Sequence, residues 1–262
     1  MFRLLKALPL TLAIVSLSIV TISCGSGNTA QVRFVNAISD DTQGLDIEFN
    51  GTKEFTDIGP FHASGSTYLG VPSGSDKIAG FATGTTTQVF SQTSPVSFSS
   101  GTQYTVVATG FLVGTVNLVA PVDTNTAPAV GTVNFRVIDA SPAGVSSVDV
   151  YIIPNTAQNT PSCILGSNCP APAISGVSSP LNSTTPYSGY KNVPFNSLGT
   201  FGYTMYVTPT NQTTPVQGWN GGYQIPEIGS VSVGSVRTIV LVDNAPGSNG
   251  MSSTPIVLSD LN

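Results

Sequence analysis

One short phrase occurs twice in this sequence, and the repetition constrains the fold more than any other feature. Arg33-Phe-Val-Asn-Ala37 precedes Leu45-Asp-Ile-Glu-Phe49, and Arg136-Val-Ile-Asp-Ala140 precedes Val148-Asp-Val-Tyr-Ile152. In both copies nine positions separate the alanine of the first segment from the aspartate of the second. The matched order and spacing indicate an internal duplication.

Two further blocks recur in the same order. Tyr68 to Pro72 matches Tyr190 to Pro194 through tyrosine, valine and proline at the same spacing, and the block 100–108 matches the block 233–241. The second copy is longer because a segment rich in Pro, Ser, Asn and Thr follows its second predicted strand, and such a segment predicts a long exposed loop. The predicted organisation is a signal peptide at 1–23, a lipidated tether at 24–30, a first repeat at 31–122, a linker at 123–130, and a second repeat at 131–262 with an inserted loop at 154–186.

Short segments that alternate between apolar and polar residues predict strands. Leu45 to Phe49 alternates strictly and ends at Asn50-Gly51, a dipeptide typical of two-residue hairpin turns. Strand candidates in the first repeat follow one another at roughly 8–12-residue spacing, which is typical of a sandwich. No segment shows sustained helical periodicity. The prediction is an all-β protein with two tandem antiparallel β-sandwich domains of the immunoglobulin-like type.

The composition favours a protein outside the cytoplasm. Charged residues make up only 8 % of the chain, compared with ~25 % in a typical soluble domain. Gly and Pro are spread throughout, and no internal apolar run approaches the ~18 residues of a membrane-spanning helix. The formal charge is −5, and no Lys/Arg cluster is present to neutralise phosphates, so nucleic acid is excluded as a partner.

The amino-terminal segment resembles a bacterial lipoprotein signal. Arg3 and Lys6 supply a positive start, and an apolar stretch too short to span a membrane comfortably leads to Thr21-Ile-Ser-Cys24. The resemblance implies cleavage before Cys24 and acylation of that residue, and two or more acyl chains give stable anchoring. The alternative is an ordinary signal peptide with an incidental cysteine. The predicted location is the bacterial cell envelope, at the outer membrane or the cell surface.

The recurring residues of the two repeats resemble a known family. The order Arg-x-x-Asn/Asp-Ala, a Val/Leu-Asp-Val/Ile strand, a Tyr-x-x-Val-Pro block and a Gly-x-x-Tyr/Arg-Thr-Val/Ile-Val segment is similar to domain of unknown function 4397. The nearest stretch is Asp139-Ala-Ser-Pro142 followed by Val148-Asp-Val-Tyr151, whereas the first copy lacks the proline at Ile38-Ser-Asp40. The resemblance implies an exported bacterial β-domain, often lipid-anchored, and brings no catalytic residues.

The remaining cysteines and the only histidine offer little chemistry. Cys163 and Cys169 lie in the inserted loop, and an oxidising compartment makes a disulfide the expected state of such a pair. A redox or zinc pair is the alternative, but zinc requires four ligands and His62 is distant. A serine hydrolase would need His62 together with a Gly-x-Ser-x-Gly motif, which the sequence lacks.

Paired carboxylates are the remaining candidates for catalysis or metal binding. Asp46 and Glu48 lie two positions apart on a predicted strand, so their side chains share one face. With Asp40 and Asp41 they offer oxygen ligands for calcium, or the two carboxylates of a glycoside hydrolase. Tyr151 stands at the position of Glu48 in the second copy, which favours the solvated face of an edge strand instead. We therefore assign no catalytic residue, metal ligand or cofactor.

The recurrent charged residues predict structural ion pairs. Arg33 and Arg136 are equivalent, as are Asp46 and Asp149 on what should be a neighbouring strand. Because charged residues are scarce here, we expect Arg33 to pair with Asp46 and Arg136 with Asp149 across strands.

Two aromatic residues form the candidate ligand-binding surface. Trp219 and Tyr223 flank an Asn-Gly turn, and such a pair either stacks on sugar rings or a peptide or packs into the core. The predicted function is a non-catalytic, lipid-anchored envelope module that binds a protein or a polysaccharide. The alternatives are a structural envelope component without a specific ligand and, less favoured, a carboxylate-dependent glycoside hydrolase.

Overall fold

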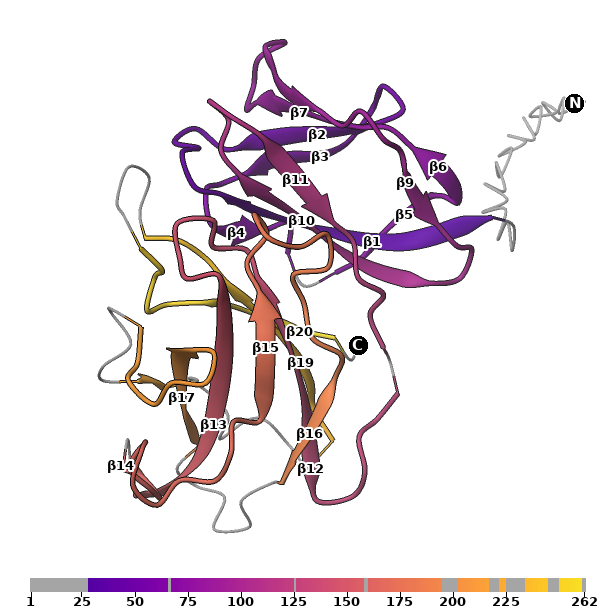
Figure 1. The fold of residues 1–262 in the computed structure, drawn as a ribbon. Helices are drawn as coiled ribbons and strands as arrows, with labels where there is room; N and C mark the ends of the chain where they lie inside the picture. The colour runs from indigo at the N-terminus through magenta and orange to yellow at the C-terminus, as the bar shows by residue number, and fades with distance from the viewer. Residues whose placement is uncertain are drawn as a thin grey trace, which may run out of the picture.

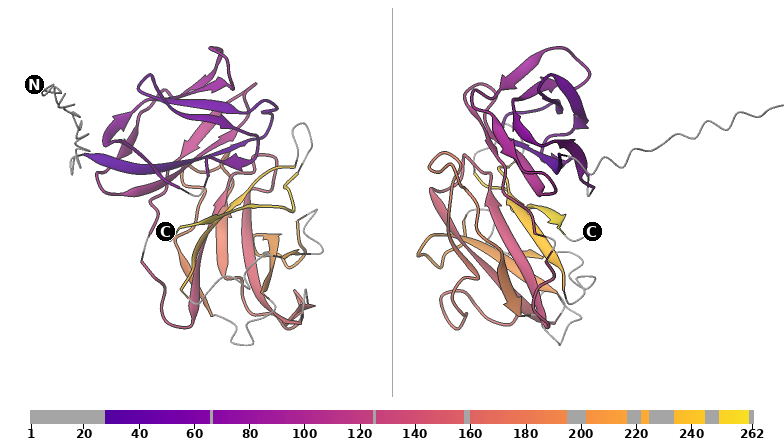
Figure 2. Two further views of the ribbon diagram at one scale, coloured as in Figure 1. Left: turned by 180° about the vertical axis from the view of Figure 1, so that it is seen from behind. Right: turned by 90° about the vertical axis from the view of Figure 1, so that its right-hand side faces the viewer.

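The structure, a computed structural model, describes residues 28–65, 67–124, 126–157, 160–194, 202–216, 222–224, 234–244 and 250–260. All regular secondary structure within these ranges is β-strand. None of the described residues forms a helix that is long and apolar enough to cross a membrane. The strands fall into two groups, which we call the first half (residues 28–124) and the second half (residues 126–260), and no sheet mixes the two. Figure 1 shows the first half, indigo to magenta, above the second half, and the two further views of Figure 2 keep the same separation.

The first half is a sandwich of two sheets with a short third pair. One sheet has the order β11-β10-β1-β4, with β5 also pairing with β1; the other has the order β3-β2-β7-β8; β6 pairs with β9. Alternate apolar residues of the two larger sheets face one another, so that Phe34 and Val106 share a fully buried core with Ile47 and Ile78. The strands are β1 (Thr29–Ile38), β2 (Leu45–Phe49), β3 (Thr52–Ile58), β4 (His62–Ala63), β5 (Leu69–Pro72), β6 (Gly74–Asp76), β7 (Ile78–Ala82), β8 (Gln88–Ser91), β9 (Val96–Phe98), β10 (Gln103–Gly110) and β11 (Val116–Val119).

The second half repeats the arrangement. Its sheets have the orders β16-β12-β19-β20 and β14-β13-β17-β18, with β15 also pairing with β13. Phe135 and Ile239 of the first sheet pack against Val150 and Met205 of the second. The strands are β12 (Thr132–Asp139), β13 (Ser147–Ala157), β14 (Thr160–Pro161), β15 (Ile174–Ser178), β16 (Lys191–Pro194), β17 (Tyr203–Pro209), β18 (Tyr223–Gln224), β19 (Val236–Leu241) and β20 (Ile256–Ser259).

Two local predictions can be compared directly with this fold. The Asn50-Gly51 hairpin is confirmed: both residues have positive φ, 50° and 82°, and Phe49 pairs with Thr52 across the turn. The segment 154–186, predicted as an exposed loop, instead contains the end of β13 together with β14 and β15. Ile174 is buried in the core because β15 pairs with β13, so part of this segment belongs to the sandwich.

The all-β sandwich class is confirmed, but one strand pair in each half departs from the predicted antiparallel arrangement. β1 runs parallel to β10, from Gln31↔Gln103 to Ile38↔Gly110, and β12 runs parallel to β19. Parallel neighbours require a long crossover connection. In the first half this crossover contains the strands between β1 and β10, four of which (β2, β3, β7 and β8) build the opposite sheet. Alternation within single strands therefore gave no sign of the parallel pairing.

The two halves meet through the strands that form these parallel pairs. Even-numbered residues of β1 face the core of the first half, and Val35 and Ala37 on its other face pack against Ile138 of β12 and Ala140, which follows that strand. This contact, which we call the central interface, is a separate buried apolar cluster that also includes Val107, Val240, Val242 and Leu258. Each parallel pair is therefore covered on both faces, and a charged side chain on the interface face has no access to water.

Candidate functional site

Arg33 of β1 is fully buried at the central interface and bonds to both halves. Its Nε donates to Oγ1 of Thr105 at 2.8 Å, and its Nη1 donates to the carbonyl oxygen of Ser259 at 2.7 Å. Its Nη2 pairs with the carboxylate of Asp260, which lies immediately after β20. The positive charge of the first half is thus neutralised mainly by a carboxylate of the second half.

Arg136 of β12 makes the reciprocal contacts. Its Nε donates to Oγ1 of Thr238 at 3.0 Å, its Nη1 donates to the carbonyl oxygen of Val122 at 2.8 Å, and its Nη2 pairs with Asp123. Asp123 lies just beyond β11, so it occupies in the first half the place that Asp260 occupies in the second. The two arginine sites are related by exchange of the halves, as in an isologous contact between two copies of one surface.

A tyrosine completes each arginine site. The guanidinium carbon lies about 5 Å from the centre of the ring, a cation–π distance, and the tyrosine hydroxyl donates to the aspartate that closes its own half. The contacts are Tyr68 with Arg33 (5.0 Å) and Asp123 (2.7 Å), and Tyr190 with Arg136 (4.7 Å) and Asp260 (2.9 Å).

The electrostatics of these groups fit a closed, neutral cluster of two arginines and two aspartates. Burial alone would lower the pKa of Arg136, but Asp123 and its neighbours outweigh burial and the pKa is raised. Burial raises the pKa of Tyr68, and Asp123 raises it further against the opposing effect of Arg33. Arg136 therefore stays charged and Tyr68 stays neutral, and because the cluster is closed to water we regard it as structural.

The predicted ion pairs were correct in naming the two arginines and wrong in their partners. Asp46 lies on the other sheet of the first half, where it accepts from Nζ of Lys53 at 2.8 Å and from the backbone N–H of Asp57 at 3.0 Å. Asp149 accepts from the backbone N–H groups of Gly176 and Asn211, at 2.8 and 2.9 Å. The strand after β1 crosses to the opposite sheet, so neighbours in sequence are not neighbours in the sheet.

The sequence interpretation missed Asp123 and Asp260, which close the cluster. Asp123 was placed in the linker, yet only 6 % of its surface is exposed. The sequence did contain a signal for these two residues, because an aspartate follows the last strand of each repeat. Apart from Asp46 and Asp149, few acidic residues recur in this way. Only the packing of the halves gives this recurrence a meaning.

A second buried carboxylate site connects the halves near the ends of β12 and β19. Asp243 accepts from the hydroxyl of Ser141, from the hydroxyl of Ser39 in the first half, and from the backbone N–H of Ala143 at 3.2 Å. Burial raises the pKa of Asp243, against the opposing effect of these donors. Asp139 lies beside it and is fully buried.

β11 lies at the edge of its sheet (Figure 1). The pockets that adjoin it form an open groove along this strand. It consists of two adjoining pockets of about 390 and 410 Å³ that share Asn117. The first lies between β11 and segment 180–184 of the second half, and the second lies between β11 and segment 89–94 of the first half. None of the described residues that line either pocket is charged; the lining consists of hydroxyl, amide, aliphatic and proline groups, with Phe90 as its one aromatic ring.

The backbone of β11 is accessible from this groove. β11 pairs with β10 on one side only, and Nε2 of Gln92 donates to the carbonyl oxygen of Val116 at 3.1 Å on the other side. Leu181 projects from the opposite wall with 58 % of its surface exposed. The groove therefore combines hydrogen-bonding groups with small apolar surfaces, and the two walls of its first pocket come from different halves.

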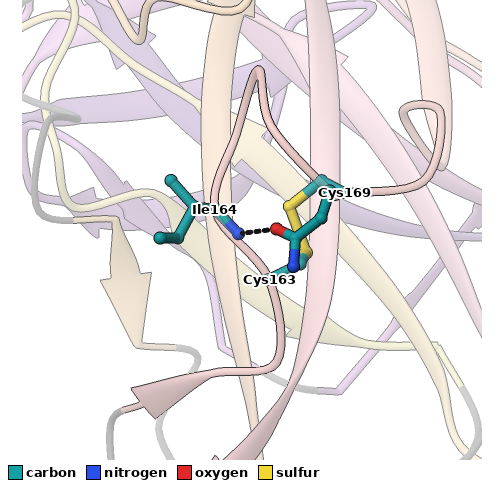
Figure 3. Close-up of a disulfide and its surroundings, with 4 residues drawn as sticks. Cys163, Ile164 and Cys169 are labelled. Atoms are coloured by element: carbon teal, nitrogen blue, oxygen red, sulfur yellow. Dashed lines mark hydrogen bonds between the residues drawn. A yellow bond between two sulfur atoms is a disulfide. The ribbon is translucent and has the colours of Figure 1, made fainter.

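The disulfide between Cys163 and Cys169 is confirmed. Their Cα atoms are 5.0 Å apart, and within the closed loop the backbone N–H of Ile164 donates to Oδ1 of Asn168 at 2.9 Å (Figure 3). The segment after this loop borders an apolar pocket of about 340 Å³ at the edge of the second sandwich, where Pro170 and Ala171 face Tyr151 and Val193. The disulfide therefore holds a loop beside an apolar pocket and is placed as a structural bond.

The other predicted site residues are placed as follows. Trp219 and Cys24 lie outside the described residues, so stacking and lipidation remain predictions. Tyr223 is half-buried and packs against the core of the second half, and burial raises its pKa. Within the ranges that the structure describes, no group of three His, Cys, Asp or Glu residues is arranged to hold a metal ion.

The comparisons with known proteins add a family. Residues 30–151 match the family described as Domain of unknown function (DUF4397). This part of the chain is therefore similar to DUF4397. This confirms the predicted resemblance over the matched residues, which include Arg33, Asp123 and Arg136, whereas Asp260 lies beyond the match. The description of DUF4397 names no activity, and no curated protein matches the chain.

Solved structures with some likeness to this chain include two carbohydrate-binding modules. One is the family CBM26 module CBMbc of Amy13K from Eubacterium rectale in complex with maltoheptaose: identity 12 %, TM-score 0.24, with 87 % of this chain and 95 % of that chain covered. The other is a family 41 module from streptococcal virulence factors: identity 11 %, TM-score 0.25, with 87 % and 98 % covered. TM-scores this low carry no argument about this chain.

Proposed function

We propose that this protein is a non-catalytic interaction module of the bacterial cell envelope, anchored through Cys24, and that it binds a neutral polysaccharide in the groove along β11. The observation that carries the proposal is the chemistry of the groove. Its two pockets fall in the size range of ligand sites, roughly 300–1,000 Å³, and the described lining carries no charge.

The absence of charge from the described lining selects the class of ligand. A charged ligand would lose hydration in the groove without gaining a counter-charge, which is unfavourable. A neutral polysaccharide offers hydroxyl groups to the amides of Asn117 and Asn182 and the hydroxyl of Ser183, and its apolar C–H faces match Leu118 and Leu181. The groove is open and extended along β11, which suits a chain better than a compact small molecule.

The test is calorimetric titration of the protein with neutral glucans, mannans and xylans, and with anionic polysaccharides as a comparison. We expect binding to a neutral polysaccharide that is weakened at least tenfold in Asn117→Ala and Asn182→Ala. Gln212→Ala, which changes an exposed amide outside the groove, is the matched control and should bind as the wild type does.

Other outcomes would redirect the proposal. Binding that survives Asn117→Ala but is lost in Trp219→Ala would place the ligand at the predicted aromatic pair instead of the groove. Binding to anionic polysaccharides alone would contradict the argument from charge. No binding to any polysaccharide would favour the structural envelope component, a role that the buried cluster between the halves supports, and cross-linking on intact cells would then search for a protein neighbour.

A further inference from the structure

Asp139 occupies in the second half the position that Asn36 occupies in the first. Each lies three residues after the buried arginine and pairs with the parallel strand, Asn36↔Ala108 and Asp139↔Leu241, and each is fully buried. Oδ1 of Asn36 accepts from the backbone N–H of Ile38 at 3.3 Å, and Oδ1 of Asp139 accepts from the backbone N–H of Ser141 at 3.0 Å. One side-chain atom therefore has the same partner in both halves.

The second side-chain atom distinguishes them. Nδ2 of Asn36 donates to Oδ2 of Asp41 at 2.6 Å and to the carbonyl oxygen of Ile58 at 3.1 Å. Oδ2 of Asp139 is buried and has no hydrogen-bond partner among the described residues. An ionised Asp139 would place a buried negative charge on an oxygen without a donor, which costs more than burying a neutral carboxyl group. A protonated Asp139 is neutral and carries one acceptor and one donor, as the Asn36 amide does.

The neighbouring carboxylate explains where the negative charge resides. Asp243 accepts from three groups, the hydroxyls of Ser39 and Ser141 and the backbone N–H of Ala143, and is the better hydrogen-bonded member of the pair. Burial raises the pKa of Asp139 to about 8; the N–H of Ser141 opposes this effect and Asp243 adds to it. Asp243 is the charged group acting on Asp139, and Tyr187, bridged to Ile138, is the titratable residue on the adjoining segment.

The acid pair is linked by hydrogen bonds to one wall of the groove. Ser141 bonds to both acids, and its carbonyl oxygen accepts from the hydroxyl of Ser179 at 3.4 Å. The backbone N–H groups of Leu181 and Asn182 donate to Ser179, at 3.4 and 2.9 Å. A continuous chain of contacts therefore leads from Asp139 to the segment that faces β11.

We propose that Asp139 and Asp243 form a proton-dependent contact: the proton on Asp139 holds segment 180–184 against β11, and its loss at alkaline pH releases this wall of the groove. The inference rests on the proposed function in one respect, because segment 180–184 is a wall of the proposed binding groove. The release itself is a property of the free protein.

The decisive variant is Asp139→Asn, which installs the amide that the first half already uses. A carboxyl whose pKa rises on folding from an ordinary ~3.9 makes its full contribution to stability at low pH and loses it as the pH rises toward the folded value. We therefore expect the unfolding equilibrium constant of the wild type, relative to Asp139→Asn, to rise about tenfold per pH unit between roughly pH 5 and 8 and then to level off. Urea titrations followed by circular dichroism measure this ratio.

Hydrogen exchange supplies the local readout. After correction for intrinsic rates, amide protection at Leu181 and Asn182 should fall in the wild type between pH 6 and 9.5 and stay constant in Asp139→Asn. Asp243→Asn removes the neighbouring charge and should move the midpoint of the wild-type change to lower pH. The control is Asp76→Asn, a buried aspartate of raised pKa that bonds to Asn50 away from the central interface and should leave protection at both amides unchanged.

Parallel pH profiles for the wild type and Asp139→Asn would overturn the proposal, as would protection at Leu181 and Asn182 that does not change with pH. These measurements contain no ligand. A protein that shows the pH-dependent release but binds no polysaccharide would refute the proposed function alone, and one that binds polysaccharide equally at pH 6 and 9.5 with unchanged protection would refute the proton-dependent contact alone.

Discussion

The two halves place the same arginine site at the central interface but differ three residues further along the strand. Arg33 and Arg136 have matching sets of partners, each comprising a threonine, a backbone carbonyl, a carboxylate and a tyrosine ring. Beyond them, Asn36 is fully hydrogen-bonded as an amide, whereas Asp139 is an acid with one oxygen that has no hydrogen-bond partner in the part of the chain that the structure describes.

The difference shows how one surface serves two purposes. Because the cluster of two arginines and two aspartates is neutral and closed, it gives the interface a fixed pairing that does not depend on pH near neutrality. The Asn36 and Asp139 positions lie outside that cluster, so a change from amide to acid there alters how one half responds to protons without disturbing the pairing. The equivalent arginine sites hold the halves together, and the change from Asn36 to Asp139 gives the two halves different responses to pH.

The largest expected effect comes from breaking the shared arginine site. Arg136→Met leaves Asp123 buried with one fewer cation, and Arg33→Met does the same to Asp260, so each should destabilise the protein by about 3–5 kcal/mol. Because the sites are equivalent, the two losses should be similar and should appear as one cooperative transition for both halves in calorimetry. A loss in one variant only, or unfolding of one half alone, would contradict the symmetry.

A smaller effect is expected from the element that only the second half contains. Replacing both Cys163 and Cys169 with serine opens a short loop and should lower the free energy of unfolding by about 2 kcal/mol on the chain-entropy estimate. Since the described contacts of this loop and of the arginine cluster have no residue in common, the double variant combined with Arg33→Met should show additive losses. Strong coupling in urea titrations would mean that the loop supports the central interface.

The smallest expected effect concerns Asp46 and Asp149, the two aspartates that were predicted to pair with the arginines. Their hydrogen-bond partners differ between the halves. Asp46 has a half-exposed lysine partner, whereas Asp149 accepts from backbone N–H groups. Lys53→Met should therefore cost only about 0.2–1 kcal/mol at pH 7.

The pH dependence of that loss has a definite sign. Burial acts to raise the pKa of Asp46, but Lys53 and two backbone N–H groups outweigh it and the pKa is lowered. A lowered pKa contributes stability above the ordinary value near 3.9, and the contribution disappears as the pH falls through the folded value. The difference between Lys53→Met and the wild type should thus vanish in acid; a difference that persists at pH 2 would show that Lys53 acts through packing.

Much of the fold was accessible from the sequence because its signals are local. Alternation around Ile47, the positive-φ dipeptide Asn50-Gly51, and the recurrence of Arg33 as Arg136 depend on a few neighbouring residues, and each predicted a feature that the structure contains. The family resemblance and the Cys163–Cys169 disulfide also follow from short spacings.

The partners of those residues were decided by the tertiary structure alone. Arg33 bonds to Asp260 across 227 positions of the chain, a contact that exists only after the two halves have packed together. The parallel pairing of β1 with β10 has the same origin, because it depends on the intervening strands crossing to another sheet. The first pocket of the groove along β11 likewise takes its two walls from different halves, so no local pattern encodes it. The sequence by itself determined which residues recur in the two halves. The packing of the two halves against each other determined which groups these residues contact. The physical reason is that a buried arginine is tolerated only where a carboxylate, here from a distant part of the chain, neutralises its charge.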